Sequence, residues 1–268
     1  MLDLSGGARL YVTLVILAGT GAAVYSFPRT PPDPGLLLLL VVASCVTSAW
    51  KINLPIPLAS GSTLSVSYAA NMMALLLLGP RLAVFVAVAG VLTQCTFNVR
   101  LRYPMYRTVF SMAAEALTMT ATGFAYQSLG GTVAPLDVPS LLKPLVGAIA
   151  TYFCLNTGLV AVAIGMSTVR SAWRVWRDDF LWSAASFMVA GTAGAIAAVV
   201  ISRGDQWKAI LLLAPIYLTY RTYHLFVGRL EDQKRHQERL AAALEETQAA
   251  RAGAEAANVL KDQFLATV

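Results

Sequence analysis

The chain has 268 residues, of which 57% are hydrophobic and only 13% are charged, whereas a soluble domain carries about 25% charged residues. The mean hydropathy of +0.64 and the grouping of the apolar residues into long blocks exclude a soluble globular domain and predict an integral membrane protein. The net charge of +6 comes from Arg and Lys in short loops, which is typical of membrane proteins and does not indicate nucleic-acid binding.

The apolar blocks predict a polytopic, all-α bundle of about eight membrane spans. Because further blocks follow the first one, that block is interpreted as a span and not as a cleaved signal peptide. Only Gly79-Pro80-Arg81 separates the third block from the fourth, which predicts a tight turn between two short helices, with one long kinked span as the alternative. The predicted spans are residues 9–27, 35–50, 64–79, 81–98, 107–129, 141–167, 180–201 and 207–222.

The segment at residues 53–67 mixes Pro, Gly and Ser with apolar residues. Its end, Thr63-Leu64-Ser65-Val66-Ser67, alternates with the period of a strand. Non-helical backbone persists at membrane depth only where protein or water covers it. The segment is therefore either the wall of a pocket, entering the third span, or a plain cytoplasmic loop.

Three basic regions lie two predicted spans apart, so they share one side of the membrane, which the positive-inside rule identifies as the cytoplasm. Counting back along the chain places the N-terminus there too, and the C-terminus follows the last basic region. The loops on the opposite side are too short to form a sensing domain. The basic regions contain Arg100, Arg102 and Arg107, then Arg170, Arg174 and Arg177, and finally Arg221, Arg229, Lys234 and Arg235.

Glu115 is the one charged residue deep within a predicted span, where a charge costs roughly 2.5–3.5 kcal/mol on insertion scales. A polar stripe follows it along one helical face, and polar residues in other spans are possible partners. The functional interpretation is a polar pocket or a proton-sensitive switch, and the alternative is interhelical hydrogen bonding that holds the bundle together. The candidate residues are Glu115, Ser111, Thr118 and Thr122 on the stripe, and Asn71, Gln94 and Asn156 on other spans.

No catalytic, cofactor-binding or metal-ligating residues are predicted. The three cysteines, Cys45, Cys95 and Cys154, all lie in apolar blocks and lack metal-ligand spacing, so neither a disulfide framework nor a metal site is expected.

Residues 223–268 are rich in Ala, Glu, Gln, Arg and Leu and contain no Pro, which favours a long cytoplasmic helix. A heptad pattern places small residues at most a and d positions, which predicts a thin seam in a coiled-coil homodimer with several registers of similar energy. Lys261 is the one charged interruption. The seam comprises Leu240, Ala243, Thr247, Ala250, Ala254, Ala257, Phe264 and Val268.

The run Ala256-Ala-Asn-Val-Leu-Lys-Asp-Gln-Phe-Leu-Ala-Thr-Val268 resembles the lead-in to the dimerisation helix of bacterial sensor histidine kinases. In that family the run continues into a Ser-His-Glu-Leu-Arg-Thr-Pro box whose His is phosphorylated. The resemblance implies that Phe264 and Leu265 pack in a dimeric bundle just before that His. The acceptor box and the ATP-binding domain are missing from this sequence, so kinase activity is not expected of it alone, and ATP and magnesium would bind only in the missing part.

The sequence therefore predicts a membrane sensor domain at residues 1–222 and a signalling helix at 223–268. Together they would form the input and transmission module of a two-component sensor histidine kinase in the bacterial inner membrane. A response regulator would be the partner in the phosphorelay, and no nucleic acid is expected. The alternatives are a small-solute transporter or channel, and a sensor module of a cyclic-dinucleotide enzyme.

Overall fold

The computed structural model describes residues 5–27, 31, 33–49, 52–53, 63–64, 67–97, 104–168, 170–204 and 235–240. The chain divides into two compact units, Met1–Leu212 and Leu213–Val268. In the second unit, residues 235–240 are helical. The predicted eighth span, at 207–222, lies outside the described residues.

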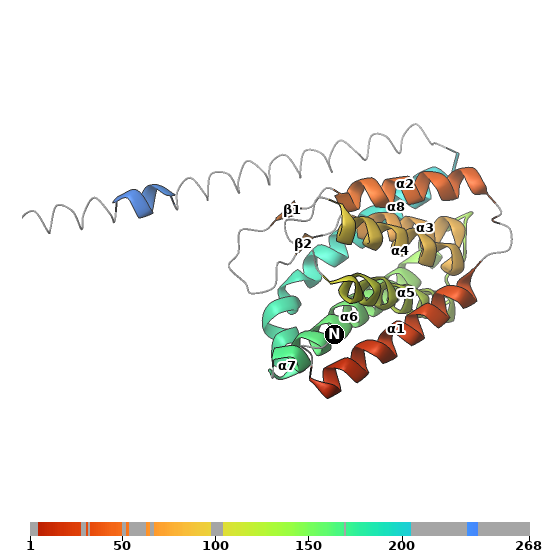
Figure 1. Ribbon diagram of the computed structural model, residues 1–268. Coiled ribbons are helices and arrows are strands. Elements are labelled where there is room, and N and C mark those ends of the chain that lie inside the picture. The colour runs from red at the N-terminus through yellow and green to blue at the C-terminus, as the bar shows by residue number, and fades with distance from the viewer. Residues whose placement is uncertain are drawn as a thin grey trace, which may run out of the picture. The chain divides into compact units, whose positions relative to one another are not determined.

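The first unit is a helical bundle (Figure 1), which confirms the all-α fold class for the described residues apart from one very short ladder. Ile52 pairs with Leu64 and Asn53 with Thr63 in two antiparallel two-residue strands, β1 and β2. The helices are α1 (Gly6–Ser26), α2 (Pro34–Ala49), α3 (Ser67–Leu78), α4 (Pro80–Thr96), α5 (Met105–Ser128), α6 (Val138–Thr168), the short α7 (Ala172–Val175) and α8 (Ala184–Ser202), with a π turn (Trp176–Phe180) and a 3-10 turn (Leu181–Ser183) joining α7 to α8.

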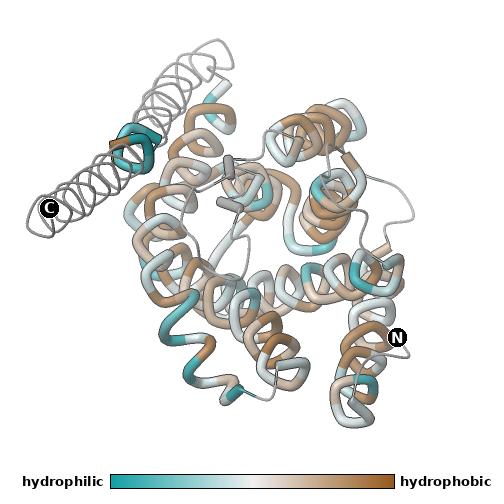
Figure 2. Tube along the Cα trace, turned by 60° about the vertical axis from the view of Figure 1, so that its left-hand side comes forward, coloured by the Kyte–Doolittle hydropathy of each residue, from teal (hydrophilic) through white to brown (hydrophobic). Residues whose placement is uncertain are grey.

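Three described segments are long and apolar enough to cross a membrane, namely α1, α6 and the continuous stretch Ala172–Ser202. Hydrophobic residues predominate along the bundle helices (Figure 2). The helices α2, α3 and α4 have 16, 12 and 17 residues, and a rise of about 1.5 Å per residue leaves each short of a hydrocarbon core about 30 Å thick. The structure thus supports three spans by length and composition, and the larger number stays a prediction.

A tight turn separates α3 from α4, so the predicted pair of short helices is present and the single kinked span is not. Gly79 has a φ of 87°, a conformation that glycine adopts without the steric cost of a Cβ. Pro80 then occupies the first position of α4, where its missing N–H is no loss to the helix.

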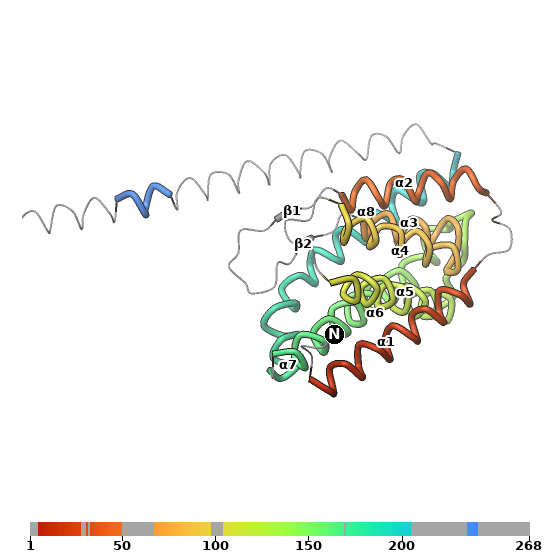
Figure 3. The backbone as a smooth tube through the Cα atoms, viewed as in Figure 1, coloured from red at the N-terminus to blue at the C-terminus, as the bar shows by residue number. Residues whose placement is uncertain are grey.

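The centre of the bundle is α3, in which 10 of 12 residues are buried. A helix that is apolar on all sides requires neighbours on all sides. Here α2, α4 and α8 pack against α3, and the loop after α5 holds its C-terminal end through a bond from Ala134 N–H to the Leu76 carbonyl. On the other side of α4, the helices α1, α5 and α6 pack together (Figure 3).

Contacts between helix ends show that the long helices alternate in direction. Ser5, at the start of α1, bonds to the Met166 carbonyl near the end of α6. At the other end of α1, Phe27 packs against Phe85 in the second turn of α4. The starts of α1 and α5 and the ends of α4 and α6 therefore lie at one end of the bundle. The basic regions around Arg107 and Arg170 share that end, as the sequence predicts.

Candidate functional site

Glu115 lies in the middle of α5 and is 2% exposed. The helix presents small residues around it, Ala113, Ala114 and Ala116, so side chains from neighbouring helices can approach its carboxylate. A buried carboxylate is tolerated only when its oxygens are hydrogen-bonded or neutralised. The surroundings of Glu115 meet the first condition.

Three side chains from two other helices donate hydrogen bonds to Glu115. The Asn71 amide on α3 and the Tyr152 hydroxyl on α6 donate to Oε1 at 3.1 and 2.6 Å. The Asn156 amide, one turn further along α6, donates to Oε2 at 2.9 Å. All three donors are uncharged, so the described residues give Glu115 no cationic partner.

The network extends outward to α2 and to a second tyrosine. The Ser44 hydroxyl on α2 donates to Asn71 Oδ1 at 3.3 Å. The ring of Tyr68 on α3 lies 4.4 Å from that of Tyr152, and its hydroxyl has no hydrogen-bond partner among the described residues although Tyr68 is only 3% exposed. We call these six residues the Glu115 cluster: Ser44, Tyr68, Asn71, Glu115, Tyr152 and Asn156.

The structure brings together three of the seven predicted polar residues, Glu115, Asn71 and Asn156. The other members of the predicted stripe do not reach the cluster. Thr118 and Thr122 are fully buried, but each hydroxyl bonds to the carbonyl four residues back in its own helix. Ser111 on α5 and Gln94 on α4 are both half-buried, and the donors to Glu115 that the structure gives are Asn71, Tyr152 and Asn156.

Sequence reasoning missed Tyr152, Ser44 and Tyr68. The spacing of Tyr152 and Asn156, four residues apart in α6, places both on one helical face and could have identified the tyrosine. Nothing comparable marks Ser44 or Tyr68, because their contacts depend on how α2, α3 and α6 pack.

The seam predicted for the signalling helix falls almost entirely outside the described residues. Leu240 is helical and 57% exposed. The other seam positions, from Ala243 to Val268, are not described.

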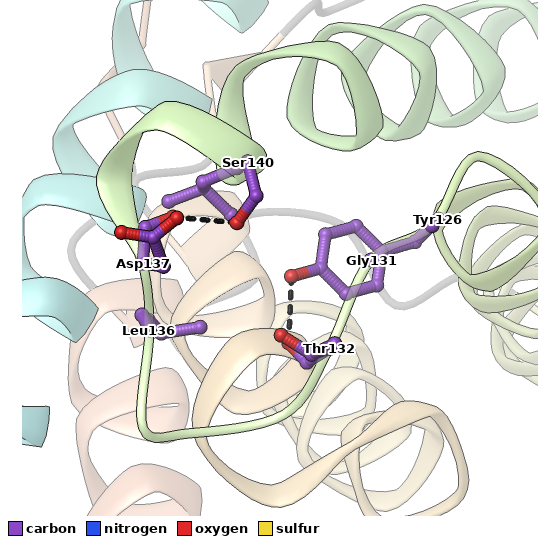
Figure 4. A pocket seen from close by; sticks show the side chains of 8 residues that line it. Tyr126, Gly131, Thr132, Leu136, Asp137 and Ser140 are labelled. Carbon is purple, nitrogen blue, oxygen red and sulfur yellow. Dashed lines mark hydrogen bonds between the residues drawn. The ribbon is translucent and has the colours of Figure 1, made fainter.

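A small pocket lies at the connection between α5 and α6, lined by Tyr126, Gly130, Gly131, Thr132, Leu136, Asp137, Ser140 and Leu141. Figure 4 shows the Tyr126 hydroxyl donating to the Thr132 carbonyl and Ser140 to Asp137. These bonds close a turn, and a Cβ on Gly131 would lie 2.5 Å from the Tyr126 ring. The contacts are those of a packed loop.

No protein family, curated protein or solved structure matches this chain. Its function is therefore argued from its own residues. Among those residues that the structure describes, no group of three or more His, Cys, Asp or Glu side chains could hold a metal ion. The Glu115 cluster is the one buried site in the described part of the chain that joins a carboxylate to polar side chains of several helices.

Proposed function

We propose that the chain is the membrane input and signal-transmission module of a bacterial two-component sensor histidine kinase. The observation that carries the proposal is the run from Ala256 to Val268, with Lys261-Asp-Gln-Phe-Leu-Ala-Thr-Val268 following a membrane bundle and a helix-favouring stretch. The apolar helices of the first unit support a membrane location. About eight spans, cytoplasmic termini and the bacterial inner membrane are parts of the same proposal.

A stimulus within the membrane, or a small ligand in the bundle, would act by changing how the helices pack. The contacts of α8 supply a route for this change. Gly194 on α8 lies so close to α3 that a Cβ would be 2.5 Å from the Ala69 carbonyl oxygen, and a Cβ on Gly191 would be 3.0 Å from the Tyr68 hydroxyl. Because α3 also carries Asn71, a rearrangement at Glu115 displaces the helix against which α8 is packed.

The helix predicted at 223–268 would carry the change to the output. Its seam of small residues gives a homodimer with registers of similar energy, so a small displacement at the membrane selects between them. In the intact kinase, the register would determine whether the ATP- and magnesium-binding domain reaches the acceptor His. A response regulator would then receive the phosphoryl group.

The test is autophosphorylation of the complete gene product in membrane vesicles supplied with magnesium and ATP. We expect a phosphohistidine located shortly after Val268. A cyclic-dinucleotide synthase or hydrolase in that place, or a gene product without an ATP-binding domain, would contradict the proposal.

The transmission step has its own test in the same vesicles. The double change Ala243→Leu, Ala250→Leu enlarges two seam positions and should lock one register, so that autophosphorylation no longer responds to the stimulus. The matched control is Ala242→Leu, Ala249→Leu, which adds the same bulk at two positions off the seam. Equal effects of both double variants on the response to the stimulus would contradict the assignment of Ala243 and Ala250 to the dimer seam.

A small-solute transporter or channel is the second candidate, and one observation favours it. The Glu115 cluster is polar and buried, and it is built partly on α3, a helix too short to cross the bilayer. Solute uptake by vesicles that contain the purified chain, abolished in Glu115→Gln, would establish this function. A chain that supports no uptake while its gene product autophosphorylates would exclude it.

A further inference from the structure

The partners of Glu115 share one chemical property. An amide can rotate to present its oxygen in place of its N–H groups, and a hydroxyl both donates and accepts. Asn71, Asn156 and Tyr152 can therefore each change from donor to acceptor. None of these three side chains is a group that can only donate, such as the side chain of Arg, Lys or Trp.

The second layer of the network permits the same reversal. Asn71 accepts a hydrogen bond from Ser44 through Oδ1 while it donates to Glu115 through Nδ2. If the amide rotates by 180°, Nδ2 faces Ser44, whose hydroxyl can accept, and Oδ1 faces Glu115. When Glu115 carries a proton or has a cation beside it, Asn71 keeps a partner on each side in the rotated orientation as well.

The cluster keeps acceptor positions that the described residues do not fill. A carboxylate offers about four lone-pair sites, and Glu115 receives three hydrogen bonds. Asn156 Oδ1 has no hydrogen bond from the described residues, and the unpartnered hydroxyl belongs to Tyr68, whose ring packs against that of Tyr152, a donor to Glu115. The faces of the Tyr68, Tyr152 and Phe187 rings, which pack against one another, add negative potential nearby.

No fixed positive charge competes for these acceptors from the described helices around the cluster. Helices α2, α3 and α8 contain no Lys, Arg or His. On α1, α4, α5 and α6 the basic residues are exposed and lie in the first two turns, and those on α5 and α6 are eight or more residues from the nearest member of the cluster: Arg9, Arg81, Arg107 and Lys143. The remaining titratable groups that face Glu115 are the hydroxyls of Tyr68 and Tyr152.

We propose that the Glu115 cluster is an intramembrane binding site for one monovalent positive charge, either a proton on the carboxylate or an alkali-metal ion beside it. With an alkali-metal ion beside the carboxylate, Asn71, Asn156 and the tyrosine hydroxyls present oxygen atoms to the cation. With a proton, one of these groups accepts the single O–H of the carboxyl and the others continue to donate to it. In the empty state Asn71, Tyr152 and Asn156 donate to the carboxylate, which is the set of contacts in the structure. Occupancy reverses at least one of these donors, and in the proposed site that donor is Asn71 on α3, which has the Ser44 hydroxyl as a partner in either orientation.

The existence of the site is independent of the output domain. Its role as the stimulus rests on the function proposed above, so binding is measured directly on the purified chain in nanodiscs. Infrared spectra at varied pH report a protonated carboxyl by its C=O stretching band. Thermal unfolding with Na⁺, K⁺ or Li⁺, against equal concentrations of the bulky cation N-methylglucamine, reports a metal ion.

A carboxyl band that is absent in Glu115→Gln and insensitive to the alkali cations identifies the proton. Stabilisation by one alkali cation that removes this band, and is itself lost in Glu115→Gln, identifies the metal ion. The control variant Asp137→Asn removes an exposed carboxylate and should leave both signals unchanged. The proposal is overturned if neither signal exists in the wild-type chain, or if Glu115→Gln retains them.

A second variant tests the composition of the site without removing the carboxylate. Tyr68→Phe removes only the unpartnered hydroxyl. We expect the proton or cation concentration at half-saturation to change about threefold, the equivalent of one average interhelical hydrogen bond in a membrane. If the variant is more stable and the concentration at half-saturation is unchanged, the hydroxyl takes no part in binding, and its assignment to the site is overturned.

Discussion

At the scale of single residues, the Glu115 carboxylate holds together donors from two helices besides its own. Glu115→Leu leaves Asn71, Tyr152 and Asn156 without their acceptor in an apolar interior. Interhelical hydrogen bonds in membranes average about 0.6 kcal/mol each, so we expect the free energy of unfolding to fall by roughly 2 kcal/mol. Denaturant-induced unfolding in mild detergent measures this loss. Glu115→Gln retains the side-chain shape and one carbonyl oxygen and should lose less than half as much, so equal losses would contradict the network.

Two neighbours of Glu115 on the predicted stripe should behave differently. Thr118 and Thr122 direct their hydroxyls to their own helix, at 2.8 and 2.7 Å from the carbonyls of Ala114 and Thr118. Each carbonyl keeps its helical partner when the hydroxyl is replaced, so Thr118→Val and Thr122→Val should each change the free energy of unfolding by less than about 1 kcal/mol. A loss as large as that of Glu115→Leu, in the same unfolding assay, would show that these hydroxyls serve the cluster.

The comparison of the stripe with the cluster shows which part of a site the sequence can predict. Glu115 was identifiable because a charge inside an apolar block is costly, and Asn71 and Asn156 because amides inside spans need partners. Threonine gives no such signal, since its hydroxyl is satisfied by the carbonyl four residues back. Tyr152 and Ser44 are common in apolar helices, and only the packing of α2, α3 and α6 makes them partners.

At the scale of the helices, two glycines bring α8 against α3. A Cβ on Gly194 would lie 2.5 Å from the Ala69 carbonyl oxygen, and backbone cannot yield as a flexible side chain does. Gly194→Ala should therefore force the helices apart and cost about 1–3 kcal/mol of unfolding free energy, as overpacking does. The matched control is Gly158→Ala on α6, where a Cβ meets nothing within 4 Å.

The control substitution should be neutral or stabilising by up to about 1 kcal/mol, because Ala favours helix over Gly. Thermal unfolding of Gly194→Ala and Gly158→Ala in the same detergent measures the two changes in stability. Similar behaviour of the two variants would show that α8 does not pack closely on α3, and would remove the route proposed from the Glu115 cluster to the signalling helix.

The order of the helices was predictable from the sequence, whereas the extent to which each helix is buried among the others was not. Seven predicted blocks coincide with described helices or with the stretch that ends in α8, because apolar blocks punctuated by Pro, Gly and Arg have unambiguous limits. The predicted third span, 64–79, became the 12-residue α3. Hydropathy alone does not distinguish a helix buried among other helices from one that faces lipid, and α3 is buried on nearly all sides.

At the scale of the whole molecule, the direction of insertion determines whether the proposed output is possible. The contacts of Ser5 with Met166, and of Phe27 with Phe85, place the start of α1 and the end of α6 at one end of the bundle and the start of α4 at the other. The connection between α5 and α6 lies at the other end, where Ala134 meets Leu76. The proposed orientation, which follows the positive-inside rule, has the first end in the cytoplasm.

Cysteine labelling in intact cells tests this orientation in the full chain. The native Cys45, Cys95 and Cys154 are first replaced by Ala, and one new cysteine is then introduced at either of two exposed positions, as Ser171→Cys or Thr132→Cys. A membrane-impermeant maleimide should label Thr132→Cys in intact cells, and Ser171→Cys only after the membrane is permeabilised. The opposite pattern would place the basic end outside. A signalling helix that continues from that end would then have no access to a cytoplasmic kinase domain, whatever the Glu115 cluster binds.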